Sequence, residues 1–303
     1  MRACGVSGNG GEVVLLELPE PPPAGPGQLL VAVEAAGVGA WDWLLDGDGW
    51  DVGLRPPAAL GVEGAGRVLA VGGGVDEFAI GDRVLAHEAP LPGASGFWAE
   101  RVLLTAAHAA HCPPGLGPVQ AAALPVNGLT AWQALAMLRL GRGQRLLVTN
   151  GAGNTGSLVI ELATTMGVEV TATASASATD RLRGIGAAQV LDYHDPTWPA
   201  QVRGQFDAAL IAASGTAAAA LPLVRHGGQL CSITSDAPPP QRGITSTNLY
   251  VRPDAAQLAQ LAQRLREGTL HLRPQPLPLR DGPAAFTRAA AGQAGGRKIV
   301  LIP

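Results

Sequence analysis

Residues 146–159, "LLVTNGAGNTGSLV", decide the fold of the central part of this chain. Three glycines stand between two apolar runs in the spacing GxGxxG: Gly151, Gly153 and Gly156. The run 145–150 is typical of a buried strand, and 155–166 has the spacing of a helix. A glycine turn from a strand into a helix leaves amides unpaired at the helix N-terminus, where a pyrophosphate binds. The stretch therefore predicts a dinucleotide-binding loop rather than an ordinary glycine turn.

Short apolar runs alternate with helix-compatible segments around this loop. The expected strands are 145–150, 168–174, 188–193, 206–213, 228–234 and 244–251. The segments 121–140 and 216–227 have helical composition, and 254–268 is expected to form a helix after the last strand. This alternation predicts βαβ units and a parallel sheet.

The first 120 residues differ in composition and are rich in glycine and proline. Their short β-rich runs, 29–38, 64–72 and 81–87, predict a compact all-β unit. A further strand is expected in the last residues, "RKIVLIP". A chain of 303 residues is long enough for about two domains.

Charge and cysteine usage exclude several classes of partner. The net charge is −3 and Lys298 is the single lysine, so neither a nucleic-acid nor an anionic-membrane surface is expected. The three cysteines are scattered and odd in number, which favours a reducing compartment; they are Cys4, Cys112 and Cys231. The N-terminus lacks the apolar region of a secretory signal, and no run approaches a membrane span. We expect a soluble, cytoplasmic protein.

Several stretches together resemble one family, the medium-chain dehydrogenase/reductases, and within it the zinc-independent quinone oxidoreductase-like branch. They occur in family order and are 61–84, 96–104, 121–135, the glycine loop, 186–193, 251–262 and 296–303. The resemblance implies an α/β protein, a Rossmann doubly wound parallel sheet plus a GroES-like β-barrel. It assigns residues 1–120 and 270–303 to the GroES-like catalytic domain and residues 121–269 to the Rossmann dinucleotide-binding domain.

Zinc enzymes of the same superfamily have a cysteine and a histidine where this chain has Gly39 and Val62. Catalytic zinc needs three protein ligands, which these residues cannot supply. The stretch 108–112, "HAAHC", offers two histidines and a cysteine, but we expect it in a loop away from the active site. No metal is expected.

The resemblance therefore implies hydride transfer from NADPH to a small-molecule quinone or α,β-unsaturated carbonyl, with the reactivity supplied by the cofactor. Two alternatives stay open. One is an enoyl reductase of a biosynthetic pathway; the other is a non-catalytic NADPH-binding protein with a reductase-like fold.

The first catalytic loop is expected within 40–53, "AWDWLLDGDGWDVG". Its tryptophans, Trp41, Trp43 and Trp50, either line a pocket for a flat substrate or pack the small β domain. Asp42 matches the family's aspartate and is either a catalytic carboxylate or a loop cap. Relatives often carry a tyrosine here as a proton donor. This loop has none, and an indole is no acid near neutral pH, so the proton source stays open.

The end of the second strand predicts which nicotinamide cofactor binds. An NAD site places an acidic side chain there, but the stretch 171–177, "TATASAS", has none. Ser175, Ser177 and Arg181 instead form a set suited to a 2′-phosphate. We expect NADPH to be preferred over NADH, with Arg181 contributing most.

Family positions add further cofactor contacts. Asn127 and Thr130 match residues that reach the nicotinamide and its phosphates, with a helix N-terminal cap as the alternative role of Thr130. Tyr193 is expected near the adenosine, or is an ordinary strand-end aromatic. The remaining predicted cofactor-binding residues are Asn150, Asn154, Thr155, Ala213 and Ile233.

The strand 244–251 would end the parallel sheet. An exposed edge strand leaves backbone N–H and C=O groups unpaired, and pairing with the same strand of a second copy satisfies them. We expect a homodimer formed through the Rossmann domain.

Overall fold

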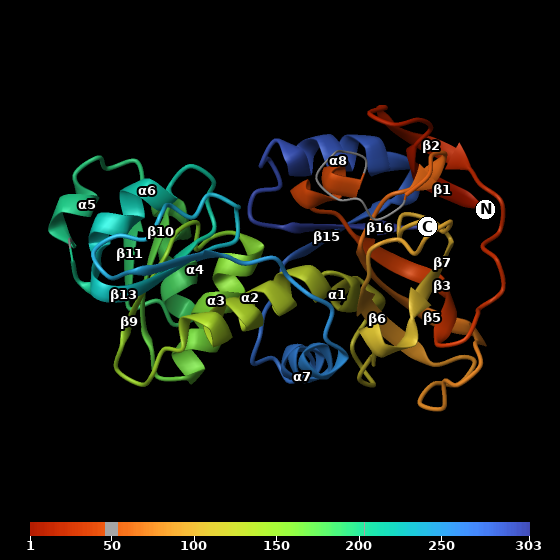
Figure 1. Cartoon of the computed structure of the whole chain (residues 1–303), viewed down its shortest axis with the longest axis horizontal. Coiled ribbons are helices and arrows are strands. Elements are labelled where there is room, and N and C mark those ends of the chain that lie inside the picture. Colours follow the sequence, from red (N-terminus) through yellow and green to blue (C-terminus); the bar gives the residue numbers. More distant parts are fainter. Residues whose placement is uncertain (46–53, 203) are drawn as a thin grey trace. The chain divides into compact units, whose positions relative to one another are not determined.

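The computed structural model describes residues 1–45, 54–202 and 204–303 (Figure 1). The chain divides into two compact units. Unit 1 contains residues 1–126, 252–268 and 272–303, and unit 2 contains residues 127–251 and 269–271.

Unit 1 is built on two β-sheets. The smaller has the order β2-β1-β4, from Val13–Glu17, Arg2–Val6 and Ala58–Ala59. The larger has the order β15-β16-β3-β5-β6-β8, and β7 also pairs with β3. Its strands are Pro274–Pro278, Lys298–Ile302, Gln28–Gly37, Glu63–Val71, Arg83–His87, Ala109–His111 and, for β7, Arg101–Thr105. The last strand of the chain, β16, therefore completes a sheet that begins with N-terminal strands.

Short helices cover these sheets. Helix α1 (Pro118–Ala122) packs against β3 and β5, and α8 (Gly282–Ala290) lies along β15 and β16, as Figure 1 shows. The 3-10 turns of unit 1 are η1 (Ala40–Leu45), η2 (Ala106–His108) and η5 (Leu279–Asp281). Phe97 and Trp98, in the segment between β6 and β7, are fully buried in its core.

The largest difference between this division and the expected boundaries lies at one helix. The sequence assigned residues 121–269 to the Rossmann domain, whereas α7 (Ala255–Arg266) clusters with unit 1. The reason is its apolar face: Leu258, Leu261 and Ala262 are buried, and the helix packs against β8. Periodicity predicts such a face but not the partner that covers it.

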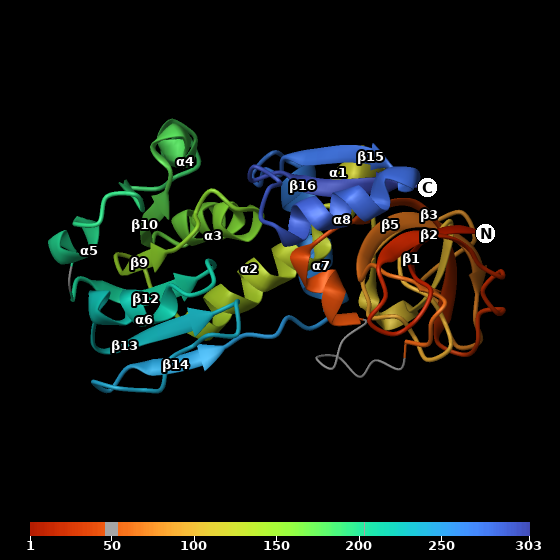
Figure 2. The ribbon, with the colours of Figure 1, turned by 90° about the horizontal axis from the view of Figure 1, so that it is seen from above.

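Unit 2 is a single six-stranded parallel sheet of order β11-β10-β9-β12-β13-β14. In chain order this is 3-2-1-4-5-6, the doubly wound Rossmann arrangement, which confirms the predicted fold class. The strands are β9 (Arg145–Val148), β10 (Glu169–Ala174), β11 (Gln189–Asp192), β12 (Phe206–Ile211), β13 (Val224–Ser232) and β14 (Thr245–Asn248). Figure 2 shows β14 beside β13 at the edge of the sheet.

The helices of unit 2 precede or connect these strands. They are α2 (Pro125–Leu138, which starts at the end of unit 1), α3 (Asn154–Thr165), α4 (Thr179–Gly184), α5 (Trp198–Gln201) and α6 (Ala217–Ala220), with 3-10 turns η3 (Ala176–Ala178) and η4 (Leu221–Leu223). Strand β9 has no exposed apolar residue, because helices cover both faces of such a sheet. In the described ranges, no helix is both long and apolar enough to cross a membrane.

One predicted helix is wrong in extent. The segment 216–227 forms only the four residues of α6 and the turn η4, and β13 starts at Val224. Pro222 lacks an amide proton and ends the helical hydrogen bonding. Gly228 then lets the strand pass its neighbour, because a Cβ there would lie 2.6 Å from the Asp207 carbonyl oxygen.

Candidate functional site

The glycine loop joins β9 to α3 through two close approaches that leave no room for a side chain. A Cβ at Gly156 would lie 2.4 Å from the carbonyl oxygen of Asn150. A Cβ at Gly151 would lie 2.7 Å from the Cβ of Ala172 on β10. The loop therefore needs glycine because the first turn of α3 lies directly against the end of the strand.

The N-terminus of α3 is open to an anion. Gly153 is its N-cap residue and supplies no side-chain cap. A helix leaves the amides of its first residues without intrahelical acceptors, here those of Asn154, Thr155 and Gly156. These amides and the helix dipole favour a phosphate at this point.

The ends of β9 and β12 are tied together where the strand order reverses, the place at which ligands bind in doubly wound sheets. The Thr149 Oγ1 accepts hydrogen bonds from the amides of Ala212 (2.9 Å) and Ala213 (3.2 Å). The Asn150 Nδ2 donates to the Ala212 carbonyl (3.1 Å). Asn150 has a φ of 52°, a conformation that asparagine tolerates better than most residues. Thr149 was not predicted; its only signal was a hydroxyl at the end of an apolar run.

Asn127 and Thr130 both lie on α2 and are buried. The Thr155 Oγ1 donates to the Asn127 Oδ1 (3.0 Å), which links α2 to the first turn of α3. Thr130 is the sixth residue of α2, so the alternative role as a helix N-terminal cap is wrong. The helix begins earlier because Pro125 suits its first position.

The end of β10 presents the predicted hydroxyl pair. Ser175 and Ser177 lie 3.1 Å apart, Oγ to Oγ, in an exposed setting. The Arg181 guanidinium points back to the glycine loop, where it donates to the Ala152 carbonyl (3.0 Å) and to the Ser157 Oγ (3.1 Å). Arg181 thus has a positioning role on the loop that the sequence did not predict.

The end of β11 lies beside that pair. Asp192 is opposite Ala174 in the parallel register, and the amide of Tyr193 donates to the Ala174 carbonyl (3.3 Å). Tyr193 is 55% exposed, and its ring lies 4.0 Å from the ring of His194. Its ring is therefore available to stack on a planar group.

The ends of β12 and β13 are joined by a carboxylate that the sequence did not single out. The Ile233 amide donates to the Ile211 carbonyl (3.0 Å), next to a cluster around Asp236. The Asp236 carboxylate accepts bonds from Ser232 Oγ (2.6 Å), Thr234 Oγ1 (2.8 Å) and the Gly215 amide (2.7 Å). Burial alone would raise the pKa of Asp236, but these hydrogen bonds hold it below its usual value.

Asp42 of unit 1 is 1% exposed. Its Oδ2 accepts a hydrogen bond from the Gly39 amide (2.8 Å), the loop-ordering contact considered from sequence. Within the described ranges its Oδ1 has no hydrogen-bond partner. Burial raises the pKa of Asp42 to about 7, so this carboxyl gains or loses its proton near neutral pH.

Trp41 packs inside unit 1. The Lys298 Nζ lies 4.5 Å from the centre of its ring, and a Cβ at Gly39 would lie 2.1 Å from its Cε2. Gly39 is therefore the residue that this ring position requires. The side chain of Trp43 and the whole of Trp50 lie outside the described residues.

A buried ion pair stands beside Trp41. The Lys298 Nζ, 1% exposed, donates to the Glu63 Oε1 and to the Val38 carbonyl (2.9 Å). The Glu63 Oε2 accepts from the amide of Val126 (2.8 Å). This pair was not predicted from the sequence. Its signal was a carboxylate and the single lysine of the chain, each at the start of a largely apolar run, "EGAG" (63–66) and "KIVLI" (298–302).

The stretch 108–112 is not the loop that was predicted. It forms the end of η2 and strand β8, which pairs with β6. His108 bonds to the Glu88 carboxylate (2.8 Å), and His111 Nε2 to the Glu77 carbonyl (2.9 Å). In the described part of the chain, no three His, Cys, Asp or Glu residues lie together as a metal site would need.

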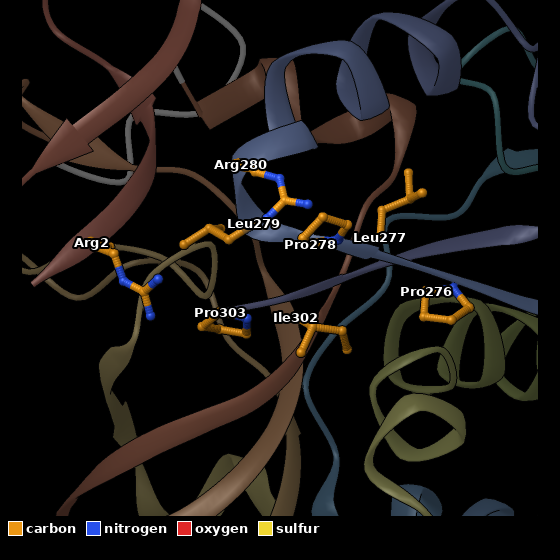
Figure 3. Close-up of a pocket in the computed structure, with 8 residues that line it drawn as sticks. All are labelled: Arg2, Pro276, Leu277, Pro278, Leu279, Arg280, Ile302 and Pro303. Carbon is orange, nitrogen blue, oxygen red and sulfur yellow. The ribbon is translucent and has the colours of Figure 1, made fainter.

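A surface pocket of about 440 Å³ opens elsewhere in unit 1 (Figure 3). It shares no residue with the predicted site; its lining is Arg2, Pro276, Leu277, Pro278, Leu279, Arg280, Ile302 and Pro303.

Two family models match the chain. The alcohol dehydrogenase GroES-like domain matches residues 25–114, and the zinc-binding dehydrogenase family matches residues 185–301. The first match lies within unit 1, and the two together agree with the resemblance found in the sequence.

Individual proteins are similar over most of the chain. Polyketide synthase GfsB of Streptomyces halstedii is 33% identical over 300 residues, 91% of this chain. The chain spans only 5% of the length of that synthase. The solved quinone oxidoreductase of Coxiella burnetii is 24% identical with a TM-score of 0.88, and the alignment covers 100% of this chain and 99% of that one. The mycobacterial protein Rv1454c, solved in complex with NADPH, is 25% identical with a TM-score of 0.83 and full coverage of both chains.

Proposed function

This chain belongs to the medium-chain dehydrogenase/reductase superfamily, and we propose that it is a zinc-independent oxidoreductase that uses NADPH to reduce a quinone or an α,β-unsaturated carbonyl. The observation that carries the proposal is the uncapped N-terminus of α3 behind a loop whose glycines admit no side chain. The NADPH complex of a protein 25% identical over the whole chain supports it.

The residues at the sheet end fit a dinucleotide. The first-turn amides of α3 would hold the pyrophosphate, and Tyr193 would stack on the adenine. Ala213 and Ile233, fixed by Thr149 and by the Ile211 carbonyl, would line the nicotinamide end. When bound, the reduced nicotinamide supplies the hydride, while the protein supplies orientation.

Preference for NADPH over NADH is supported by the end of β10. An NAD site needs a carboxylate there to accept the ribose hydroxyls. This chain has Ala174 followed by the hydroxyls of Ser175 and Ser177. The serine hydroxyls can donate hydrogen bonds to a 2′-phosphate, but they are weaker acceptors for the ribose hydroxyls than a carboxylate would be.

Asp42 is our candidate for the proton that follows the hydride. A general acid works best when its pKa lies near the operating pH, and the pKa of Asp42 is about 7. The proton would be held at Oδ1, the atom without a partner in the described ranges.

Independence from zinc is supported by Gly39 and Val62 at the two ligand positions. The Trp41 ring occupies the space that a side chain at position 39 would need. We expect less than 0.1 zinc per chain by elemental analysis, and activity that survives chelators. One zinc per chain, removed with loss of activity, would contradict this.

A second candidate function is reduction of an enoyl thioester. The polyketide synthase GfsB, 33% identical over 91% of this chain, favours it. An enoyl thioester is itself an α,β-unsaturated carbonyl, so the same residues would serve.

One screen tests these proposals: NADPH oxidation by the purified protein with quinones, enones and enoyl thioesters, read at 340 nm. Turnover of quinones or simple enones supports the first function, and turnover confined to thioesters supports the second. Tight NADPH binding with no turnover of any class would indicate a non-catalytic binding protein. No binding of NADPH would contradict all three.

We also propose a homodimer in a reducing, cytoplasmic setting. Strand β14 is the edge of the parallel sheet, and the three cysteines are free, two of them buried. Light scattering at micromolar concentration should give twice the mass of the chain. A monomeric mass would contradict pairing through β14.

A further inference from the structure

We propose that His194 makes the preference for NADPH depend on pH, by acting at the 2′-phosphate only when its ring is protonated. This rests on the proposed use of NADPH. It assigns a role to a residue that sequence analysis left without one.

The first step is the position of His194. Strands β10 and β11 are parallel neighbours, with Ala174 opposite Asp192. The amide of Tyr193, the residue before His194, donates to the carbonyl of Ala174, the residue before Ser175 (3.3 Å). The segment that carries His194 is thus fixed to the hydroxyl pair expected to take the 2′-phosphate.

The second step is the orientation of the His194 ring. Its Nδ1 lies 2.8 Å from the Asp192 Oδ1, which also accepts the His194 amide (3.0 Å). Its ring lies against Tyr193 with 4.0 Å between centroids. Because Asp192 accepts the Nδ1 proton, the neutral ring has an acceptor at Nε2, and the protonated ring has a donor there. A phosphate dianion has only acceptor oxygens, so it can form a hydrogen bond only with the protonated ring.

The third step is the charge around this loop. Asp192 is a carboxylate at the expected phosphate site, and Asp195 is a second one nearby. Helix α4, which packs against β11 and η3, adds Asp180, Arg181 and Arg183. Protonated His194 cancels the charge of Asp192, so the pair changes from neutral to −1 as the ring loses its proton. A 2′-phosphate is repelled more strongly by the second state. The preference for a 2′-phosphate should therefore be largest at low pH and decrease as the pH rises.

The experiment uses two fragments that carry only the adenosine end, adenosine 2′,5′-bisphosphate and 5′-AMP. Their dissociation constants are measured by calorimetry from pH 5.5 to 8.5 on the full chain and on His194→Gln. The 2′-phosphate itself titrates near pH 6, and dividing the wild-type preference by that of the variant cancels this effect. His226→Gln, at an exposed histidine on β13, is the matched control.

The divided preference is the wild-type preference for the bisphosphate over 5′-AMP divided by the same preference of His194→Gln. We expect it to decrease about two- to fivefold from pH 5.5 to pH 8.5, the effect typical of one exposed ion pair. His226→Gln should follow the wild type, and 5′-AMP should bind both histidine variants equally. A divided preference that is flat with pH overturns the proposal while NADPH use stands. Equal binding of the two fragments by the wild type overturns both this proposal and the NADPH preference.

Discussion

The two units handle polar groups in opposite ways. In unit 1, Glu63, Lys298 and Asp42 are at most 1% exposed and interact mainly with one another and with nearby backbone. In unit 2, the groups that we propose to contact the cofactor are backbone amides at α3 and exposed side chains such as Tyr193 and His194. Electrostatic interactions between buried charges are strong, because little water screens them. Interactions between exposed groups are screened, so these groups are nearly independent of one another. Substitutions should therefore have large, coupled effects in unit 1 and small, local effects in unit 2.

The largest effect is expected from Lys298→Met. It leaves the Glu63 carboxylate buried without its cation, which should lower the free energy of unfolding by about 3–5 kcal/mol. Urea denaturation followed by circular dichroism measures it.

The double variant Glu63→Gln with Lys298→Met is its control. It removes both charges, so it should regain at least half of the lost stability. Equal losses in the single and double variants would contradict a coupled pair.

The next effect is the pH dependence caused by Asp42. Its pKa is raised from 3.8 to about 7, so the folded state keeps a proton that the unfolded state has lost. The contribution of Asp42 to the free energy of unfolding is therefore fully present below pH 4. It decreases as the pH rises toward 7, by on the order of 3–4 kcal/mol. Asp42→Asn cannot ionise, so the difference in unfolding free energy between wild type and variant should change by that amount from pH 4 to pH 8. A constant difference would show that Asp42 is ionised throughout.

In unit 2 the glycine loop should respond to added volume rather than to charge. Gly156→Ala places a Cβ 2.4 Å from a backbone oxygen, so the loop must move. We expect a loss of about 1–3 kcal/mol in stability and at least about tenfold weaker NADPH binding by fluorescence titration. Gly184→Ala is the control, because nothing lies within 4 Å of a Cβ added there and alanine is favourable in a helix such as α4. If both variants bind NADPH as the wild type does, the loop is not the phosphate site.

The smallest effect is expected from Arg181→Ala. The residue donates two hydrogen bonds to the glycine loop and is also a candidate contact for the 2′-phosphate. NADH should weaken about threefold from the loosened loop, and NADPH about tenfold or more. Arg183→Ala, exposed on the same helix, should change neither. An equal loss for both cofactors would assign Arg181 to the loop alone.

Local patterns predicted what depends on neighbours in sequence. The GxGxxG loop, the β10 hydroxyls and the order of apolar runs follow from spacing and periodicity, and the structure contains each of them. The packing of α7 on unit 1 and the pairing of Glu63 with Lys298 depend on segments more than a hundred residues apart. The contacts of Thr149 and Asp236 depend on which strand ends are neighbours. Sequence could suggest these residues only as polar exceptions in apolar surroundings.

The pairing of β16 with β3 has a consequence for synthesis on the ribosome. Lys298 reaches the Val38 carbonyl across 260 residues, so unit 1 cannot finish its larger sheet until the final strand has emerged. The residues of unit 2 are contiguous from 127 to 251 apart from a three-residue addition, and they are complete earlier. The pairing of β16 with β3 should also be slower than the folding of unit 2, because contacts between residues distant in sequence form late. Unit 2 should therefore become protease-resistant on nascent chains before β16 has paired with β3 of unit 1.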